Sequence, residues 1–278
     1  MPIITFWTEL NKEIGQTAAA IAAATQMAME HNKRILLMST YNNQELQDAF
    51  WHPSAGNKKL ISSLLGNQKK VMIDNGISGM AKALASNRLN PEQIPNYTKT
   101  VFKGRLEILS GFNGEEKEYE ELKPIYPDVI QRANRFYDVV IIDLNKTMSD
   151  FANSILDISN IVAYGINQKN KSIEHYMESK ESGFISTRND VIPYIARYDQ
   201  YSKYSTKNIG RLIREKRKIN VMPYNTLFAE ACDEGTVADY FLKVGTIKGE
   251  DRNVKFLGDI RSLTDAIIYR LQELQMKI

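Results

Sequence analysis

Residues 3–41 read IITFWTELNKEIGQTAAAIAAATQMAMEHNKRILLMSTY. The apolar run Ile3–Phe6 gives way to a polar turn, a Gly-Gln-Thr tripeptide at 15–17 opens an alanine-rich stretch, and a second apolar run follows at Ile35–Met38. Short apolar runs bounded by turn residues predict buried strands, and the alanine-rich stretch predicts a helix over Thr17–Glu30. Strand, loop, helix and strand in this order can hold a phosphate at the N-terminus of the helix.

The loop keeps little of the usual phosphate-binding pattern, G-x-x-x-x-G-K-[ST]. That pattern needs glycines for close approach to the ligand, a lysine for the β- and γ-phosphates and a hydroxyl for Mg²⁺. With Thr17 as the hydroxyl, Gly15 is the second glycine, Gln16 occupies the lysine position and Leu10 the first glycine position. Gly15, Gln16 and Thr17 are therefore candidate nucleotide-binding residues of a degenerate loop.

The loop resembles that of the ParA/MinD family of deviant Walker A ATPases, which reads K-G-G-x-G-K-T. In that family the first lysine reaches the nucleotide of the partner subunit in a sandwich dimer. Here the first lysine becomes Asn11, the two glycines become Lys12 and Glu13, and the second lysine becomes Gln16.

Two later landmarks follow in the order that the family has. Residues 136–143, FYDVVIID, resemble its YDxVIID strand, whose Asp governs the metal and the attacking water. Residues 222–225, MPYN, resemble the loop that lines the adenine. The resemblance thus implies nucleotide-site roles for Asp143 and Pro223, and it implies that Thr17 and Asp143 would hold Mg²⁺ if the ion is bound.

The chain also departs from the family after two strands. Where the family usually has Asp-x-Asp after the second strand, the residues are Ser39, Thr40 and Tyr41. The glycine expected four residues after Asp143 is Thr147. Groups that serve water activation and the γ-phosphate response are therefore replaced.

Composition places the chain among ordinary globular proteins. It has 278 residues, 43% of them hydrophobic and 25% charged, which suits one α/β domain over 1–278. Cys232 cannot form a disulfide within the chain, and we expect it to be a packing residue. The three histidines lack the spacing of zinc ligands. With no signal peptide and no apolar stretch of about 18 residues, we expect a cytoplasmic protein.

Further strands and helices alternate along the chain. This alternation predicts a doubly wound, mostly parallel sheet flanked by helices, the α/β fold that the resemblance also implies. We expect a helix, a turn and a short helix over Gly76–Tyr97, and one helix from the acidic run at 115–121 to Phe136. Further strands are expected at residues 70–73, 104–111, 136–143, 160–166, 191–197 and 218–222.

The C-terminal stretch Gly258–Lys277 has apolar residues at helical spacing. Division-site members of the family place a basic C-terminal helix on membranes. Because acidic residues offset the basic ones here, we expect this helix to pack on its own sheet.

A basic cluster comprises Arg211, Arg214, Lys216, Arg217 and Lys218. Basic residues at a helix C-terminus are stabilised by the helix dipole. Partition members of the family bind DNA without sequence preference through such residues, so Arg211, Arg214, Arg217 and Lys218 are also candidate DNA contacts. A net charge of +3 does not by itself demand a nucleic-acid partner.

Three functions remain open. The hypothesis that we adopt is a degenerate pseudo-ATPase that acts as a localisation or assembly adaptor, like the TadZ/CpaE branch of the family. The alternatives are a weak nucleotide switch that binds ATP or ADP with Mg²⁺, and a non-specific DNA-binding protein. We expect protein partners of a positioned assembly and a homodimer through the loop face, with Lys12, Glu13, Trp7 and Tyr41 in the contact.

Overall fold

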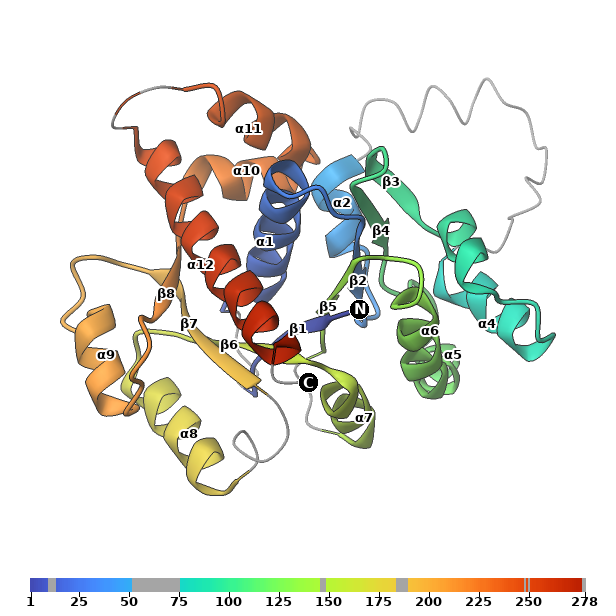
Figure 1. Cartoon of the computed structure of the whole chain (residues 1–278), viewed down its shortest axis with the longest axis horizontal. Helices are drawn as coiled ribbons and strands as arrows, with labels where there is room; N and C mark the ends of the chain where they lie inside the picture. Colours follow the sequence, from blue (N-terminus) through green and yellow to red (C-terminus); the bar gives the residue numbers. More distant parts are fainter. Residues whose placement is uncertain are drawn as a thin grey trace.

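The computed structural model of the chain describes residues 1–9, 14–51, 76–145, 149–183, 190–247, 249 and 251–276. Within these ranges eight strands form one sheet in the order β3-β4-β2-β5-β1-β6-β7-β8 (Figure 1). The strands are β1 (Ile3–Trp7), β2 (Ile35–Ser39), β3 (Lys99–Phe102), β4 (Leu106–Leu109), β5 (Val139–Asp143), β6 (Ile161–Ile166), β7 (Asp190–Tyr198) and β8 (Asn220–Pro223). Only the β3–β4 pair is antiparallel among them, so the predicted mostly parallel sheet is confirmed.

Helices cover both faces of the sheet (Figure 1). The helices of one layer are α1 (Gln16–Glu30), α2 (Glu45–Trp51), α10 (Thr226–Glu234), α11 (Val237–Val244) and α12 (Arg252–Gln275). The other layer contains α4 (Ile77–Ala85), α5 (Glu116–Leu122), α6 (Tyr126–Ala133), α7 (Asp150–Ile158), α8 (Asn170–Glu181) and α9 (Thr206–Leu212), with the short 3₁₀ helices η1 (Pro91–Tyr97) and η2 (Lys123–Ile125).

The central strands are buried on both faces, which explains their continuous apolar runs. Ile4 and Phe6 of β1 join the core beneath α1, whereas Ile3 and Trp7 join the core on the opposite face. A strand that contributes to two cores needs apolar side chains at successive positions instead of alternate ones.

Helix α1 is the most deeply enclosed helix of its layer. It lies between the sheet and α12, and residues 19–24 are almost completely buried. Alanine at most of these positions lets the helix approach both neighbours closely. The C-terminal helix α12 packs on α1 and β8 through Phe256, Ile260, Leu263 and Ile267, so the predicted packing on its own sheet is confirmed. None of the helices in the described ranges is long and apolar enough to cross a membrane.

Three details differ from the sequence expectations. β3 was not predicted, because its four residues are partly exposed at the sheet edge and form no apolar run. The helix expected between the acidic run and Phe136 is divided into α5, η2 and α6, since Pro124 and Pro127 have no N–H to donate to the preceding turn. α12 begins at Arg252, six residues before the predicted start. The strand expected at 70–73 lies outside the described residues.

Candidate functional site

Three of the predicted site residues meet where β5 ends and α1 begins. Asp143 is fully buried, and its carboxylate accepts two hydrogen bonds from the first turn of α1. Gln16 Nε2 donates to Asp143 Oδ1 at 2.7 Å, and Thr17 Oγ1 donates to Asp143 Oδ2 at 2.8 Å. The structure therefore brings together Gln16, Thr17 and Asp143, three of the candidate nucleotide-binding residues.

The side chain of Gln16 is turned into the protein. Its Nε2 also donates to the carbonyl oxygen of Leu144 at 2.8 Å, so both amide hydrogens have partners inside the chain. Gln16 is 1% exposed, and its Oε1 has no hydrogen-bond partner among the residues that the structure describes. The residue in the lysine position thus offers a ligand neither a charge nor a remaining N–H.

The start of α1 keeps features that favour an anion. Gly15 is in the left-handed region, with φ 76° and ψ 31°, and it caps the helix without a side-chain hydrogen bond. The first N–H groups of a helix have no partner within the helix, and together with the helix dipole they attract negative charge. A phosphate group could therefore still be held here by backbone groups.

Behind the loop, Ile14 anchors the helix start to the core. Ile14 is 1% exposed, and it packs over Gly165 of β6. A Cβ atom at position 165 would lie 2.6 Å from Ile14 Cδ1 and 3.1 Å from Tyr194 Oη, so only glycine fits without a shift. Burial, together with the nearby Asp143 carboxylate, raises the pKa of Tyr194, which keeps its hydroxyl neutral.

A neutral network occupies the end of β2, where the resemblance expects two carboxylates. The Thr40 amide donates to the Asp143 carbonyl oxygen at 3.0 Å, and the Asn145 amide donates to Thr40 Oγ1 at 2.8 Å. The Tyr119 hydroxyl donates to the Thr40 carbonyl oxygen. These contacts fix β2 against β5 but supply no acid or base.

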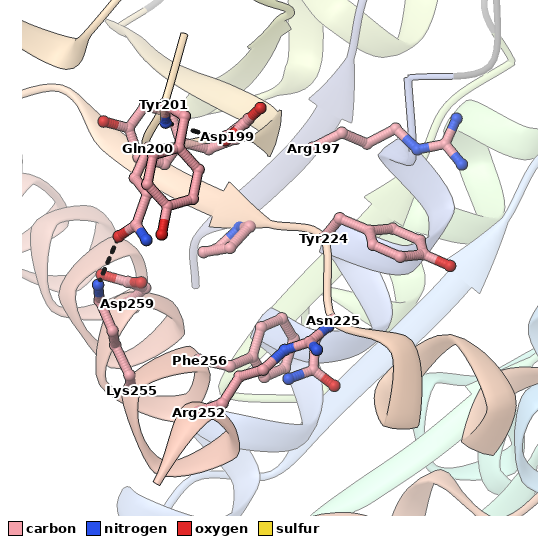
Figure 2. Close-up of a pocket in the computed structure, with 12 residues that line it drawn as sticks. Arg197, Asp199, Gln200, Tyr201, Tyr224, Asn225, Arg252, Lys255, Phe256 and Asp259 are labelled. Carbon is pink, nitrogen blue, oxygen red and sulfur yellow. Dashed lines mark hydrogen bonds between the residues drawn. The ribbon is translucent and has the colours of Figure 1, made fainter. Parts of the chain in front are cut away.

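A pocket of about 450 Å³ lies beyond the ends of β7 and β8 (Figure 2). The predicted residue Pro223 lines it, and so do Tyr224 and Asn225 from the same connection to α10. Arg197 of β7 and two residues of α12, Arg252 and Phe256, also line the pocket. The other lining residues are Tyr198, Asp199, Gln200, Tyr201, Lys255 and Asp259. The lining therefore combines aromatic and cationic side chains with two carboxylates, Asp199 and Asp259, and Arg197 connects it to Gly15 at the start of α1.

Sequence reasoning missed the contribution of β7 and α12 to this pocket. Arg197 follows an apolar run in the sequence, which is an ordinary place for a charged residue at a strand end. The direction of its side chain follows from a backbone φ of 51°, and no pattern in the sequence predicted this φ. Arg252 and Phe256 lie near the N-terminus of α12, and the sequence-based start of that helix at Gly258 excluded them.

The basic cluster divides into two groups. All five residues are exposed, and Arg217 and Lys218 of the second group also make side-chain contacts within the chain. Arg217 donates to Asp190 Oδ1 at 3.2 Å, to Glu215 Oε1 at 3.3 Å and to the Val191 carbonyl oxygen at 2.8 Å, so it ties the connection before β8 to the start of β7. Lys218 Nζ lies 3.4 Å from Ser262 Oγ.

The expected loop-face interface needs one correction. Trp7 is 1% exposed and packs edge-on against Tyr164 at 5.8 Å, so it cannot contribute to an exposed contact surface. The prediction for Trp7 is wrong because β1 is buried on both faces. Asn11, Lys12 and Glu13, and also Thr147, lie outside the described residues.

Cys232 is the packing residue that the sequence predicted. It lies in α10 and packs on the core beneath α1. Burial raises the pKa of its thiol to about 12, with the nearby Glu45 and Asp233 carboxylates adding to the effect. The thiol is therefore protonated and unreactive at neutral pH.

Comparisons with known proteins agree with this fold. No family model matches the chain. No curated protein matches it either. Among solved structures, the ParA family ATPase from Chlorobium tepidum TLS has a TM-score of 0.70 at 14% identity, over 95% of this chain and 98% of that chain.

Two MinD structures give similar values. The cell division ATPase MinD from Pyrococcus furiosus has a TM-score of 0.67 at 14% identity, over 96% of this chain and 100% of that chain. The septum site-determining protein MinD from Pyrococcus horikoshii OT3, complexed with Mg-ADP, has a TM-score of 0.66 at 13% identity, over 96% of this chain and 97% of that chain. The chain therefore has the fold of the ParA/MinD ATPases, along nearly its whole length.

Proposed function

We propose that this chain is a ParA/MinD-like protein that has lost ATP hydrolysis and acts as a localisation or assembly adaptor. The observation that carries the proposal is the hydrogen bonding of Gln16. Both amide hydrogens of this side chain are used on Asp143 and on Leu144, so the lysine position supplies nothing to a γ-phosphate.

Phosphoryl transfer depends mainly on compensation of the phosphate charges, because little covalent work falls to the protein. Removal of one well-placed electrostatic group typically slows such a reaction by about 10²–10³-fold. Here Gln16 replaces one lysine, Asn11 replaces the other, and a neutral network around Thr40 replaces the acids after β2. Several losses of this size leave no appreciable turnover.

A second candidate function is a weak nucleotide switch that binds ADP or ATP with Mg²⁺. The specific observation in its favour is that Thr17 and Asp143 still lie in contact at 2.8 Å beside a helix start. A hydroxyl and a carboxylate are suitable oxygen ligands for Mg²⁺. This candidate and the adaptor are compatible, since a protein can bind a nucleotide without hydrolysing it.

The adaptor function predicts a position in the cell that does not need nucleotide turnover. A fluorescent fusion of the whole chain should form discrete foci in the organism that encodes it. The fusion with Thr17→Ala, checked to be folded because the change also removes the hydrogen bond to Asp143, should form the same foci, since the adaptor role does not need Mg²⁺ or nucleotide. A uniform distribution of the unchanged protein would contradict the adaptor role, and foci that disperse with Thr17→Ala would favour the nucleotide switch.

A further inference from the structure

We infer that Arg197 of β7 supplies a cation in place of the two signature lysines, which are Asn11 and Gln16 in this chain, and that it binds the phosphate groups of a nucleotide held beside the start of α1. The inference rests on the second candidate function, nucleotide binding, and it requires no hydrolysis. Arg197, near the end of its strand, would thus contact the phosphates in the way that the two loop lysines do in the pattern K-G-G-x-G-K-T.

The backbone of Arg197 is unusual for its place in the sheet. Its φ of 51° lies in the left-handed region, which side-chain-bearing residues rarely adopt. The pairing of β7 with β8 shifts register at this residue, between Ala196 and Tyr198. Irregularities of this kind turn a side chain in a new direction, and strained residues concentrate at ligand-binding sites.

The turned side chain lies against the helix start. A Cβ atom on Gly15 would lie 3.5 Å from Arg197 Cγ and 4.0 Å from Arg197 Cδ, so the aliphatic stem of Arg197 packs over Gly15. The guanidinium carbon is 5.9 Å from the centre of the Tyr224 ring, within the range of a cation–π contact. Figure 2 shows Arg197 and Tyr224 extending in the same direction, away from Asp199 and Lys255.

The polar groups at this position fit a phosphate and its surroundings. Arg197 is exposed on the molecular surface. Guanidinium groups bind phosphates through paired hydrogen bonds, and the N–H groups of a helix start add to this attraction.

Arg197 also joins the helix start to the pocket at the ends of β7 and β8, because it lines that pocket. A ligand with phosphates at α1 could place its remaining part against Tyr224 and Phe256. This arrangement selects a phosphorylated ligand over the same ligand without phosphates, and the selectivity depends on Arg197.

The test is isothermal titration calorimetry of the whole protein with ADP and with adenosine, each with Mg²⁺. We expect ADP to bind more tightly than adenosine. Arg197→Ala should weaken ADP binding by about 10-fold or more, the loss typical of a charge-assisted hydrogen bond, and should weaken adenosine binding much less, because adenosine has no phosphate for Arg197 to bind. Arg197→Lys should recover part of the ADP affinity.

Two further variants make the result decisive. Arg211→Ala removes an exposed arginine at the end of α9, away from the pocket lining, and should change neither affinity. Arg197→Gly suits the left-handed backbone and replaces Arg197→Ala if the alanine variant proves unfolded. Equal losses for ADP and adenosine in the Arg197 variants, or no ADP binding by the unchanged protein at 1 mM ligand (roughly −4 kcal/mol), would overturn the inference.

Discussion

Gln16 differs from a lysine in charge and also in the direction in which its hydrogen-bond donors point. A lysine carries three donors on a mobile ammonium, whereas the Gln16 amide has two donors, and both point to Asp143 and Leu144. The sequence was sufficient to predict the loss of charge. It could not show that the amide is turned inward, because that depends on the distance between the end of β5 and the first turn of α1.

At Arg197 the strained backbone allows a prediction for stability. Arg197→Ala keeps a side chain in the left-handed region, which costs roughly 1–2 kcal/mol per residue, whereas Arg197→Gly removes that cost. Both variants lose the contact with Gly15. We therefore expect the glycine variant to have a free energy of unfolding about 1 kcal/mol higher than the alanine variant, measured by urea denaturation. A more stable alanine variant would show that φ is not strained at this position.

At the scale of elements, the unit β1, loop and α1 was predictable because its pattern is local. The continuous apolar runs predicted the buried strands β1, β2, β5 and β6, and Gly15 predicted the helix start. The antiparallel strand β3 was not predictable in this way, since its pairing with β4 depends on an edge position and not on burial. The pocket also depends on distant elements, because β7, β8 and α12 meet only in the folded sheet.

The packing of Ile14 beneath the start of α1 gives a prediction for the stability of the β1, loop and α1 unit. Gly165→Ala would place a Cβ atom 2.6 Å from Ile14 Cδ1 and should lower the free energy of unfolding by about 1–3 kcal/mol. The matched control is Gly258→Ala within α12, where a new Cβ atom meets nothing within 4 Å, and it should raise the free energy of unfolding by about 0.5–1 kcal/mol. Equal effects of the two changes, measured by thermal and urea denaturation, would contradict this packing.

At the scale of the whole molecule, charge is distributed unevenly although the net value is only +3. Residues 203–218 contain seven Lys and Arg side chains and one acidic residue, Glu215. Arg217 forms ion pairs with Asp190 and Glu215, so the exposed residues Arg211, Arg214 and Lys216 are the better candidates for contacts with an anionic partner. Such a small surface can attract DNA only weakly, because each phosphate contact contributes separately and is screened by salt.

We therefore expect weak binding of duplex DNA that disappears as salt rises. Fluorescence anisotropy with a labelled duplex should show binding near 20 mM NaCl and none near 200 mM, since counterion release governs such contacts (slope roughly −0.9 per phosphate). Arg211→Glu with Arg214→Glu should abolish the low-salt binding. Tight binding at the higher salt that is lost in this double variant would support the partition-like function instead.

The hydrolysis assay tests the central claim most directly. Purified protein should be incubated with Mg²⁺-ATP, and phosphate release should be followed for the unchanged chain and for Thr17→Ala, which removes the hydroxyl that contacts Asp143. We predict that both proteins release phosphate at the same rate as buffer alone. Phosphate release by the unchanged chain that is lost in the Thr17→Ala variant would contradict the loss of hydrolysis that the inward-turned Gln16 implies.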